Sequence, residues 1–338
     1  MKQAVLQRPG QLEIVEVARP EPGPGEFRVR SVAVGICGSD LHAFGGHHPF
    51  ITLPVVPGHE VAGIVESAGP GASGFEPGDR VLLEPNLVCG RCFYCVSGRY
   101  NLCEKLEVIG CQTAGGLAEA FVAPGGRLHL VPGGMSWTAA ALVEPLSTAT
   151  HAARMAGDLN GAAVVVLGSG SIGLLTMLSA KAAGAAAIVM TDPVESKRAG
   201  ALELGATAAV DSRDPEAAQA IRAALPHRPD VVFDCVAIEA SINQAIVLAE
   251  KGGTVIVVGV PRGPVQVPLP IIQDREIRIQ GSAMYVQEDV LLAIQLIADG
   301  VVDAERIVTA RYPLERAAEA FEAARSGSHV KVHITLDA

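Results

Sequence analysis

The chain has 338 residues, of which 49% are hydrophobic and 18% are charged, and it carries a formal net charge of −10. Its length suffices for two domains of ordinary size, and its composition is that of a folded globular protein with ample apolar surface to bury. The acidic balance, without a run of Lys and Arg, argues against nucleic acid as a partner, because a phosphate backbone requires a concentrated basic face.

Residues 1–17 alternate between apolar and polar side chains and lack the basic start and apolar block of a secretory signal. The sequence contains no run of about 18 apolar residues, so it predicts no membrane span. We therefore expect a cytoplasmic protein without a membrane partner. In that compartment thiols stay reduced, so clustered cysteines bind metal more often than they form disulfides.

Residues 1–145 are rich in Pro and Gly and contain short alternating apolar runs, such as 27–35, 60–69 and 79–85. A period of two between turn residues is typical of β-strands. We therefore expect a turn-rich, largely antiparallel β region at the beginning of the chain.

Two motifs in this region, VGICGSDLH and PGHE, contain side chains that can bind metal. They comprise Cys37, Ser39, Asp40, His42, His59 and Glu60. Thiol, imidazole and carboxylate ligands together suit zinc, and three protein ligands leave a fourth position open for water or substrate. Further along the chain, AALVEPLST adds the carboxylate of Glu144. Each residue also has a plainer explanation: a buried His is usually hydrogen-bonded within the protein, and Glu144, before Pro145, fits a turn. Spacing alone does not assemble these residues, because they are far apart in the sequence.

Four of the chain's seven cysteines lie in one short segment, at Cys89, Cys92, Cys95 and Cys103. Thiolates at such intervals can converge tetrahedrally on one Zn²⁺ at about 2.3 Å. Four protein ligands leave no open position, so we predict a structural zinc ion in a lobe at about residues 87–104. The alternatives are an iron–sulfur cluster, although the Cys-Pro that often follows such a run is missing, and a redox Cys-x-x-Cys, although four thiols exceed what one disulfide requires. The remaining thiols, Cys111 and Cys235, are expected to be ordinary buried cysteines.

After a helical stretch at residues 134–157, the pattern changes to short apolar strands that alternate with alanine-rich helices. The strands are predicted at residues 162–168, 187–192, 208–211, 231–236 and 253–259. Such alternation with short links predicts parallel βαβ units and a doubly wound sheet. Two further helical patterns, 290–300 and 314–327, and a final strand, 329–336, complete the chain.

The stretch VVVLGSGSIGLL places Gly168, Gly170 and Gly173 in G-x-G-x-x-G spacing between a strand and a helix. The next strand ends in Asp192, nineteen residues after Gly173. This context predicts a dinucleotide site, with the pyrophosphate at the helix N-terminus and Asp192 accepting hydrogen bonds from the ribose. Because Asp192 would repel a 2′-phosphate, NAD is favoured over NADP, although Lys197 and Arg198 lie nearby. The alternative is a loop of small residues without a ligand.

In their order and spacing, these motifs resemble those of the zinc-dependent medium-chain dehydrogenases, and most closely their polyol (sorbitol) and threonine dehydrogenase branch. The resemblance covers essentially the whole chain. It implies an α/β fold with a GroES-like, mostly β catalytic domain at residues 1–146 and a Rossmann NAD-binding domain at 147–281. Residues 282–338 would return to the catalytic domain.

The resemblance also implies roles for single residues. Cys37, His59 and Glu60 would ligate a catalytic zinc, and Glu144 would hold its water or ligate it directly. Asp40 would orient His59, Ser39 would take the alcohol proton, and His42 would pass it on towards solvent by way of the cofactor ribose. The remaining cofactor contacts implied by the resemblance are Ile172, Lys197, Val258 and Val260.

By the same resemblance, we expect an enzyme with NAD and two zinc ions per chain, assembled as a homodimer or homotetramer. It would transfer a hydride from a secondary alcohol of a polyol, sugar acid or vicinal diol. The alternatives are an L-threonine or simple secondary alcohol dehydrogenase, an NADPH-dependent carbonyl reductase on the same scaffold, and a non-catalytic nucleotide-binding protein.

Overall fold

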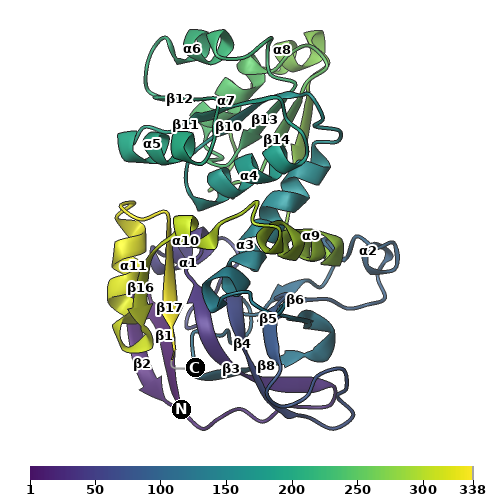
Figure 1. The fold of residues 1–338 in the computed structure, drawn as a ribbon, viewed down its shortest axis with the longest axis vertical. Coiled ribbons are helices and arrows are strands. Elements are labelled where there is room, and N and C mark those ends of the chain that lie inside the picture. Colours follow the sequence, from purple (N-terminus) through teal and green to yellow (C-terminus); the bar gives the residue numbers. More distant parts are fainter. Residues whose placement is uncertain (337–338) are drawn as a thin grey trace. The chain divides into compact units, whose positions relative to one another are not determined.

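The computed structural model describes residues 1–336, which form two compact units (Figure 1). The first unit comprises residues 1–145 together with the segment from Val286 onward, and the second comprises Leu146–Tyr285. Helix α3 (Trp137–Met155) begins in the first unit and ends in the second. No helix within the described range is long and apolar enough to cross a membrane.

The first unit is built on a seven-stranded sheet whose central strand, β3 (Glu26–Gly35), pairs with three others. The strand order is β16-β17-β3-β4-β5-β9, and β8 also pairs with β3. The bounds are β4 (Glu60–Ala68), β5 (Arg80–Leu83), β8 (Ala120–Pro124), β9 (Leu128–Leu130), β16 (Val308–Pro313) and β17 (Lys331–Thr335). All these pairs are antiparallel except β16 with β17, which confirms the predicted β region.

The last strand, β17, pairs with β3, so the end of the chain returns to the sheet formed by its beginning. Alternating residues of β17 explain its place: Val332 and Ile334 join the apolar core of this unit, where they accompany Phe27, Phe121 and Phe321. Lys331 and His333 point to the opposite face, because successive side chains of a strand alternate.

Smaller elements complete the first unit. Two strand pairs are formed by β1 (Lys2–Arg8) with β2 (Gln11–Glu16) and by β6 (Asn86–Leu87) with β7 (Glu107–Val108). The helices are α1 (Gly38–Phe44), α2 (Phe93–Val96), α9 (Gln287–Ala298), α10 (Ala304–Ile307) and α11 (Ala317–Arg325), with 3₁₀ turns η1 (Tyr100–Leu102), η2 (Gly125–Arg127) and η3 (Leu314–Arg316).

The second unit contains a six-stranded sheet in which every pair is parallel, in the order β12-β11-β10-β13-β14-β15. The bounds are β10 (Ala163–Leu167), β11 (Ala187–Thr191), β12 (Ala208–Val210), β13 (Val231–Asp234), β14 (Thr254–Val257) and β15 (Arg278–Gly281). The order reverses beside β10, which is the doubly wound arrangement of dinucleotide-binding domains. The predicted parallel sheet is therefore confirmed.

Helices flank this sheet on both sides, with α6 and α8 on one side and α4 and α5 on the other (Figure 1). Their bounds are α4 (Ser171–Ala182), α5 (Glu195–Glu203), α6 (Ala217–Ala223), α7 (Glu239–Leu248) and α8 (Leu269–Asp274). Because both faces are covered, the central strands are apolar throughout, and every residue of β10 and β11 is buried.

Candidate active site and metal centres

Cys37 lies in the turn between β3 and α1, where the chain leaves the sheet and starts a helix. Its backbone N–H donates to Oδ2 of Asp40 at 2.8 Å, which fixes the turn at the helix N-terminus. The Sγ atom of Cys37 lies 3.1 Å from the hydroxyl oxygen of Ser39. The first predicted motif thus places a thiol and a hydroxyl group side by side.

His59 and Glu60 meet Cys37 because β4 begins where β3 ends, with Glu60 opposite Gly35 in the register. A Cβ atom at Gly35 would lie 1.8 Å from Oε2 of Glu60, so only glycine leaves room for this carboxylate. One donor atom each of Cys37, His59 and Glu60 lie within 4.8 Å of one another. A thiol, an imidazole and a carboxylate at this separation fit a zinc ion with an open position.

Two further groups face Nδ1 of His59. Oδ1 of Asp40 lies 3.7 Å away, and the thiol of Cys111 lies 3.9 Å away. Burial lowers the pKa of His59, but the negative charges of Asp40, Cys111 and Cys37 outweigh it and raise the pKa well above 6.5. Such neighbours make an imidazole a stronger metal ligand and fix its orientation. We expected Cys111 to be an ordinary buried thiol, and no local sequence signal indicates its place beside His59.

Lys331 adjoins the candidate site, and the sequence motifs did not indicate it. Its ammonium group is buried, lies against the carboxylate of Glu60, and donates to the carbonyl of Ile36 at 3.0 Å. Burial lowers the pKa of Lys331, but Glu60 and Cys37 outweigh this effect and raise it. The buried cation therefore compensates part of the negative charge that the ligands gather. Its signal in the sequence is the alternation of HVKVHITL, which places a lysine in a buried strand.

Glu144 lies in helix α3, so the alternative that it occupies a turn before Pro145 is wrong. Its side chain is buried, and its charge is one of those that raise the pKa of Lys331. Within the described residues, however, the group able to share one ion comprises Cys37, His59 and Glu60 without Glu144. His42 lies in the last turn of α1 and is half-buried.

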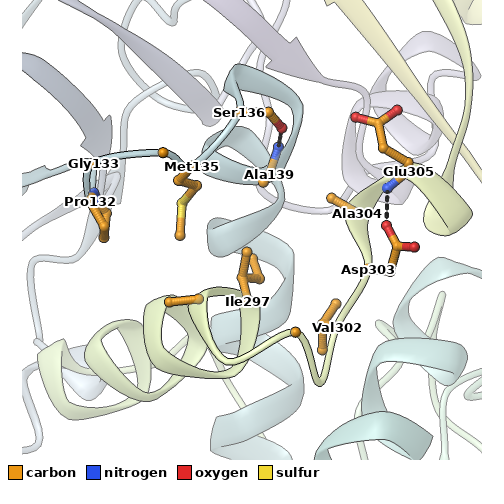
Figure 2. Close-up of a pocket in the computed structure, with 13 residues that line it drawn as sticks. Pro132, Gly133, Met135, Ser136, Ala139, Ile297, Val302, Asp303, Ala304 and Glu305 are labelled. Carbon is orange, nitrogen blue, oxygen red and sulfur yellow. Dashed lines mark hydrogen bonds between the residues drawn. The ribbon is translucent and has the colours of Figure 1, made fainter.

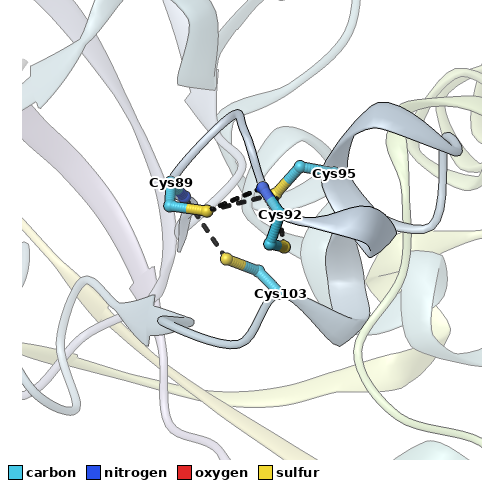
Figure 3. A group of neighbouring side chains, drawn as sticks. All are labelled: Cys89, Cys92, Cys95 and Cys103. Atoms are coloured by element: carbon cyan, nitrogen blue, oxygen red, sulfur yellow. Dashed lines mark hydrogen bonds between the residues drawn. The ribbon is translucent and has the colours of Figure 1, made fainter.

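The four-cysteine segment forms a separate cluster (Figure 3). Sγ of Cys95 lies 3.5 Å from that of Cys92 and 3.9 Å from that of Cys89, and all four thiols can reach one ion. Backbone amides of Arg91 and Cys92 lower the pKa of Cys89 to about 6. Four convergent thiols, partly stabilised as thiolates, fit a closed tetrahedral zinc site.

The lobe of these cysteines is attached to the sheet through Tyr100. Its hydroxyl group donates to the buried Glu84 at 2.8 Å, and Arg127 and His129 bind the same carboxylate at 2.5 and 3.0 Å. The backbone N–H of Gln287, at the start of α9, donates to the hydroxyl oxygen of Tyr100. A buried carboxylate with three partners is a firm anchor for a small lobe.

The glycine loop of the second unit follows β10 and starts α4. Gly168 has a φ of +93°, and a Cβ atom at Gly173 would lie 1.8 Å from the carbonyl oxygen of Gly168. A Cβ atom at Gly170, in contrast, would meet no atom of the described residues within 4 Å. The first and third glycines are therefore required by the turn and by packing, whereas packing does not require the second. This pattern suits close approach of a pyrophosphate to the backbone at Gly170.

Asp192 follows β11 and is buried. Its two carboxylate oxygens accept the backbone N–H groups of Ser169 and Val194 at 3.0 and 2.9 Å. The other predicted cofactor contacts lie after neighbouring strands: Ile172 in α4, Lys197 in α5, and Val258 and Val260 after β14. Carboxyl ends of parallel strands share one edge of a sheet, where this fold class binds its ligands.

A cavity of about 590 Å³ in the first unit is lined by residues 132–139 and 297–305 (Figure 2). Met135, Ile297 and Val302 contribute apolar side chains to its wall, and Asp303 and Glu305 stand at its edge. Asp303 accepts the backbone N–H of Glu305 at 3.0 Å, and Glu305 pairs with Arg311. None of the candidate metal ligands lines this cavity, so it is not part of the candidate active site.

Two family models match the chain, the alcohol dehydrogenase GroES-like domain at residues 23–133 and the zinc-binding dehydrogenase at residues 171–299. The sorbitol dehydrogenase of Gallus gallus is 37% identical over 344 residues, which cover 98% of this chain and 96% of that relative. The L-idonate 5-dehydrogenase of Vitis vinifera is 36% identical over 338 residues, covering 96% and 92%. The chain belongs to the zinc-dependent medium-chain dehydrogenases, in their polyol dehydrogenase branch.

A solved zinc-binding dehydrogenase of Sinorhizobium meliloti 1021, bound to NADP, is 35% identical, with a TM-score of 0.93 and 99% coverage of both chains. The family, the GroES-like and Rossmann fold class, and the assignment as a polyol-type dehydrogenase with a small-molecule substrate are thus confirmed. The role of each site residue stays a prediction.

Proposed function

We propose that this dehydrogenase transfers a hydride from a secondary alcohol of a polyol, sugar acid or vicinal diol to NAD, with two zinc ions per chain. The observation that carries the proposal is the convergence of Cys37, His59 and Glu60 within 4.8 Å. Three unlike ligands leave a coordination position for the substrate, whereas the four cysteines of the lobe leave none. The sugar-alcohol and sugar-acid relatives favour a polyhydroxylated substrate.

A zinc ion on these ligands would supply a Lewis acid that lowers the pKa of a bound alcohol. The protein must then remove one proton. The hydroxyl group of Ser39, whose oxygen lies 3.1 Å from the thiol of Cys37, would accept it. His42, three residues further along α1, would pass the proton on towards solvent. Asp40 and Cys111, at 3.7 and 3.9 Å from Nδ1 of His59, would favour one orientation of its imidazole.

For the cofactor, we propose NAD in preference to NADP. The carboxylate of Asp192 is held in place by the amides of Ser169 and Val194, so it cannot readily turn away from a ribose 2′-phosphate. The NADP found with the Sinorhizobium meliloti protein favours the second candidate, an NADPH-linked reductase on the same scaffold. Titration with NADH and NADPH separates the two, because this reasoning predicts much weaker binding of NADPH.

We further propose a homodimer or homotetramer. Strand β15 ends the order of the parallel sheet and, among residues 1–336, pairs only with β14; all four of its residues are exposed. An exposed strand edge offers unpaired backbone groups to a second chain. Light scattering of the purified protein tests this proposal, and a strictly monomeric mass would refute it.

The main experiment measures NADH formation by absorbance across polyols, sugar acids, vicinal diols and threonine, with metal analysis of the same sample. We expect activity on polyhydroxylated secondary alcohols and two zinc ions per chain. A preference for threonine or for a simple secondary alcohol would show that the proposed substrate class is wrong and that this other alcohol is the substrate. Lack of activity on the entire panel, in a protein with both zinc ions, would contradict the proposed reaction.

A further inference from the structure

The loop between α1 and β4 has its two ends at the candidate active site. It starts after Phe44, the last residue of the helix that carries Ser39 and His42, and it ends before His59. The backbone N–H of His47 donates to the carbonyl of His42 at 2.8 Å, so the loop folds back onto the helix.

The path of this loop is determined by its neighbours. Gly46 has a φ of +73°, and a Cβ atom there would lie 2.7 Å from the ring of Pro9. Further along, the carbonyl of Phe50 accepts the side-chain amide of Gln112 at 2.8 Å. Gln112 directly follows Cys111, whose thiol lies 3.9 Å from His59. The loop is therefore held against the same segment that contacts a candidate zinc ligand.

His48 lies between these two attachment points and is half-buried. Its Nδ1 accepts the backbone N–H of Phe50 at 3.2 Å, so the proton of the neutral ring resides on Nε2. Burial lowers the pKa of His48, and the imidazoles of His42 and His59 lower it further. With Nδ1 engaged by Phe50, His48 presents Nε2 as a hydrogen-bond donor on a loop whose two ends lie at the candidate active site.

We propose that His48 is a specificity-determining residue whose Nε2–H donates to a second hydroxyl group of the substrate, next to the carbon that loses the hydride. The inference rests on the proposed function. A donor fixed by its own loop would favour vicinal diols and polyols over alcohols with a single hydroxyl group, since it has no partner in the latter. His48 would recognise a hydroxyl oxygen on the carbon next to the one that loses the hydride.

The test compares 2,3-butanediol with 2-butanol, which differ in this hydroxyl group, in the zinc-loaded enzyme with NAD. We expect His48→Phe, which keeps a flat ring but removes the donor, to lower kcat/KM for the diol by about 10–50-fold and to change that for 2-butanol by less than about twofold. His48→Gln retains an N–H donor and should recover part of the diol preference. His47→Phe, at the neighbouring exposed position, is the matched control and should leave both values unchanged.

An equal loss on both substrates in His48→Phe would overturn the inference, because it would show a general role in folding or chemistry. An unchanged diol preference would overturn it as well. Zinc content and thermal stability, measured on each variant, identify a loss due to misfolding. If His48→Phe misfolds, the diol preference of His48→Gln decides whether the inference holds. If the wild-type enzyme oxidises neither alcohol nor any polyol, the proposed function itself fails, and the inference fails with it.

Discussion

The two candidate metal centres of the first unit differ in how the chain assembles them. The four thiols of the lobe come from one segment, Cys89 to Cys103, and they meet one another within it. The mixed group of Cys37, His59 and Glu60 exists only because β3 and β4 pair with Gly35 opposite Glu60. One centre is therefore encoded locally, and the other depends on the register of the sheet.

They also differ in how negative charge is compensated. In the lobe, backbone N–H groups stabilise the thiols, as at Cys89, and the site is partly exposed to water. At the mixed centre, the charge of Glu60 is balanced by the buried ammonium group of Lys331 from β17. A closed, solvated site of this kind serves stability, whereas a buried open site with balanced charge can do chemistry.

The largest effect is expected at the mixed centre. Cys37→Ser removes the thiolate ligand, and we expect kcat/KM to fall on the order of 10⁴-fold, because the Lewis acid is lost or misplaced. Zinc content should fall from two ions to one per chain, since the lobe does not depend on Cys37. Retention of both ions with full activity would show that Cys37 is not a ligand.

The lobe should behave in the opposite way. Cys95→Ser removes one of four equivalent ligands, and we expect a loss of roughly 3–4 kcal/mol in the free energy of unfolding, because metal binding and folding of such a lobe are linked. The folded fraction should keep most of its kcat. Urea unfolding with kinetic assays checks this expectation. Loss of kcat at unchanged stability would mean that the lobe acts on the chemistry, for example through the contact between Tyr100 and Gln287.

The same contrast explains how much the sequence could predict. The cysteine cluster, the glycine loop and most of the strands have local signals in spacing and periodicity, and they lie where those signals indicate. Strands β8, β9, β15 and β16 lie outside the predicted strands. The environment of the mixed centre has no such signal. Lys331 on β17 reaches Glu60 on β4 across β3, which pairs with both strands, and Cys111 reaches His59 across 52 residues of sequence.

A further prediction concerns His333, two residues after Lys331 on β17. Both of its ring nitrogens are buried and have no hydrogen-bond partner among the described residues. Burial, and then the charges of Lys331 and Arg311, lower its pKa to about 3. In the unfolded chain His333 has an ordinary pKa near 6.5. As the pH falls, the unfolded state therefore binds a proton at His333 before the folded state does. The contribution of neutral His333 to the free energy of unfolding is fully present above about pH 6.5. It is lost as the pH falls towards the pKa of the folded state, by about 1.4 kcal/mol per pH unit.

His333→Leu should remove this dependence. Between pH 6.5 and 4.5 we expect the wild type to lose about 2–3 kcal/mol more in free energy of unfolding than the variant. Urea unfolding at the two pH values, in the presence of zinc, measures the difference. His227→Leu, at a half-exposed position of the second unit, should keep the slope of the wild type. Equal slopes in His333→Leu and the wild type would show that His333 is protonated as readily in the folded protein as in the unfolded chain.

The smallest effect is expected for Glu144→Ala. Glu144 lies outside the group of three ligands, and its charge reaches the mixed centre by way of Lys331. We expect kcat/KM to fall about tenfold, with both zinc ions retained, because such a residue tunes the site without holding the metal. Glu144→Gln, which keeps the shape but not the charge, separates the contribution of charge from that of packing. If Glu144→Ala lowered kcat/KM as much as Cys37→Ser and the two variants had the same zinc content, Glu144 would instead be a full member of the catalytic centre.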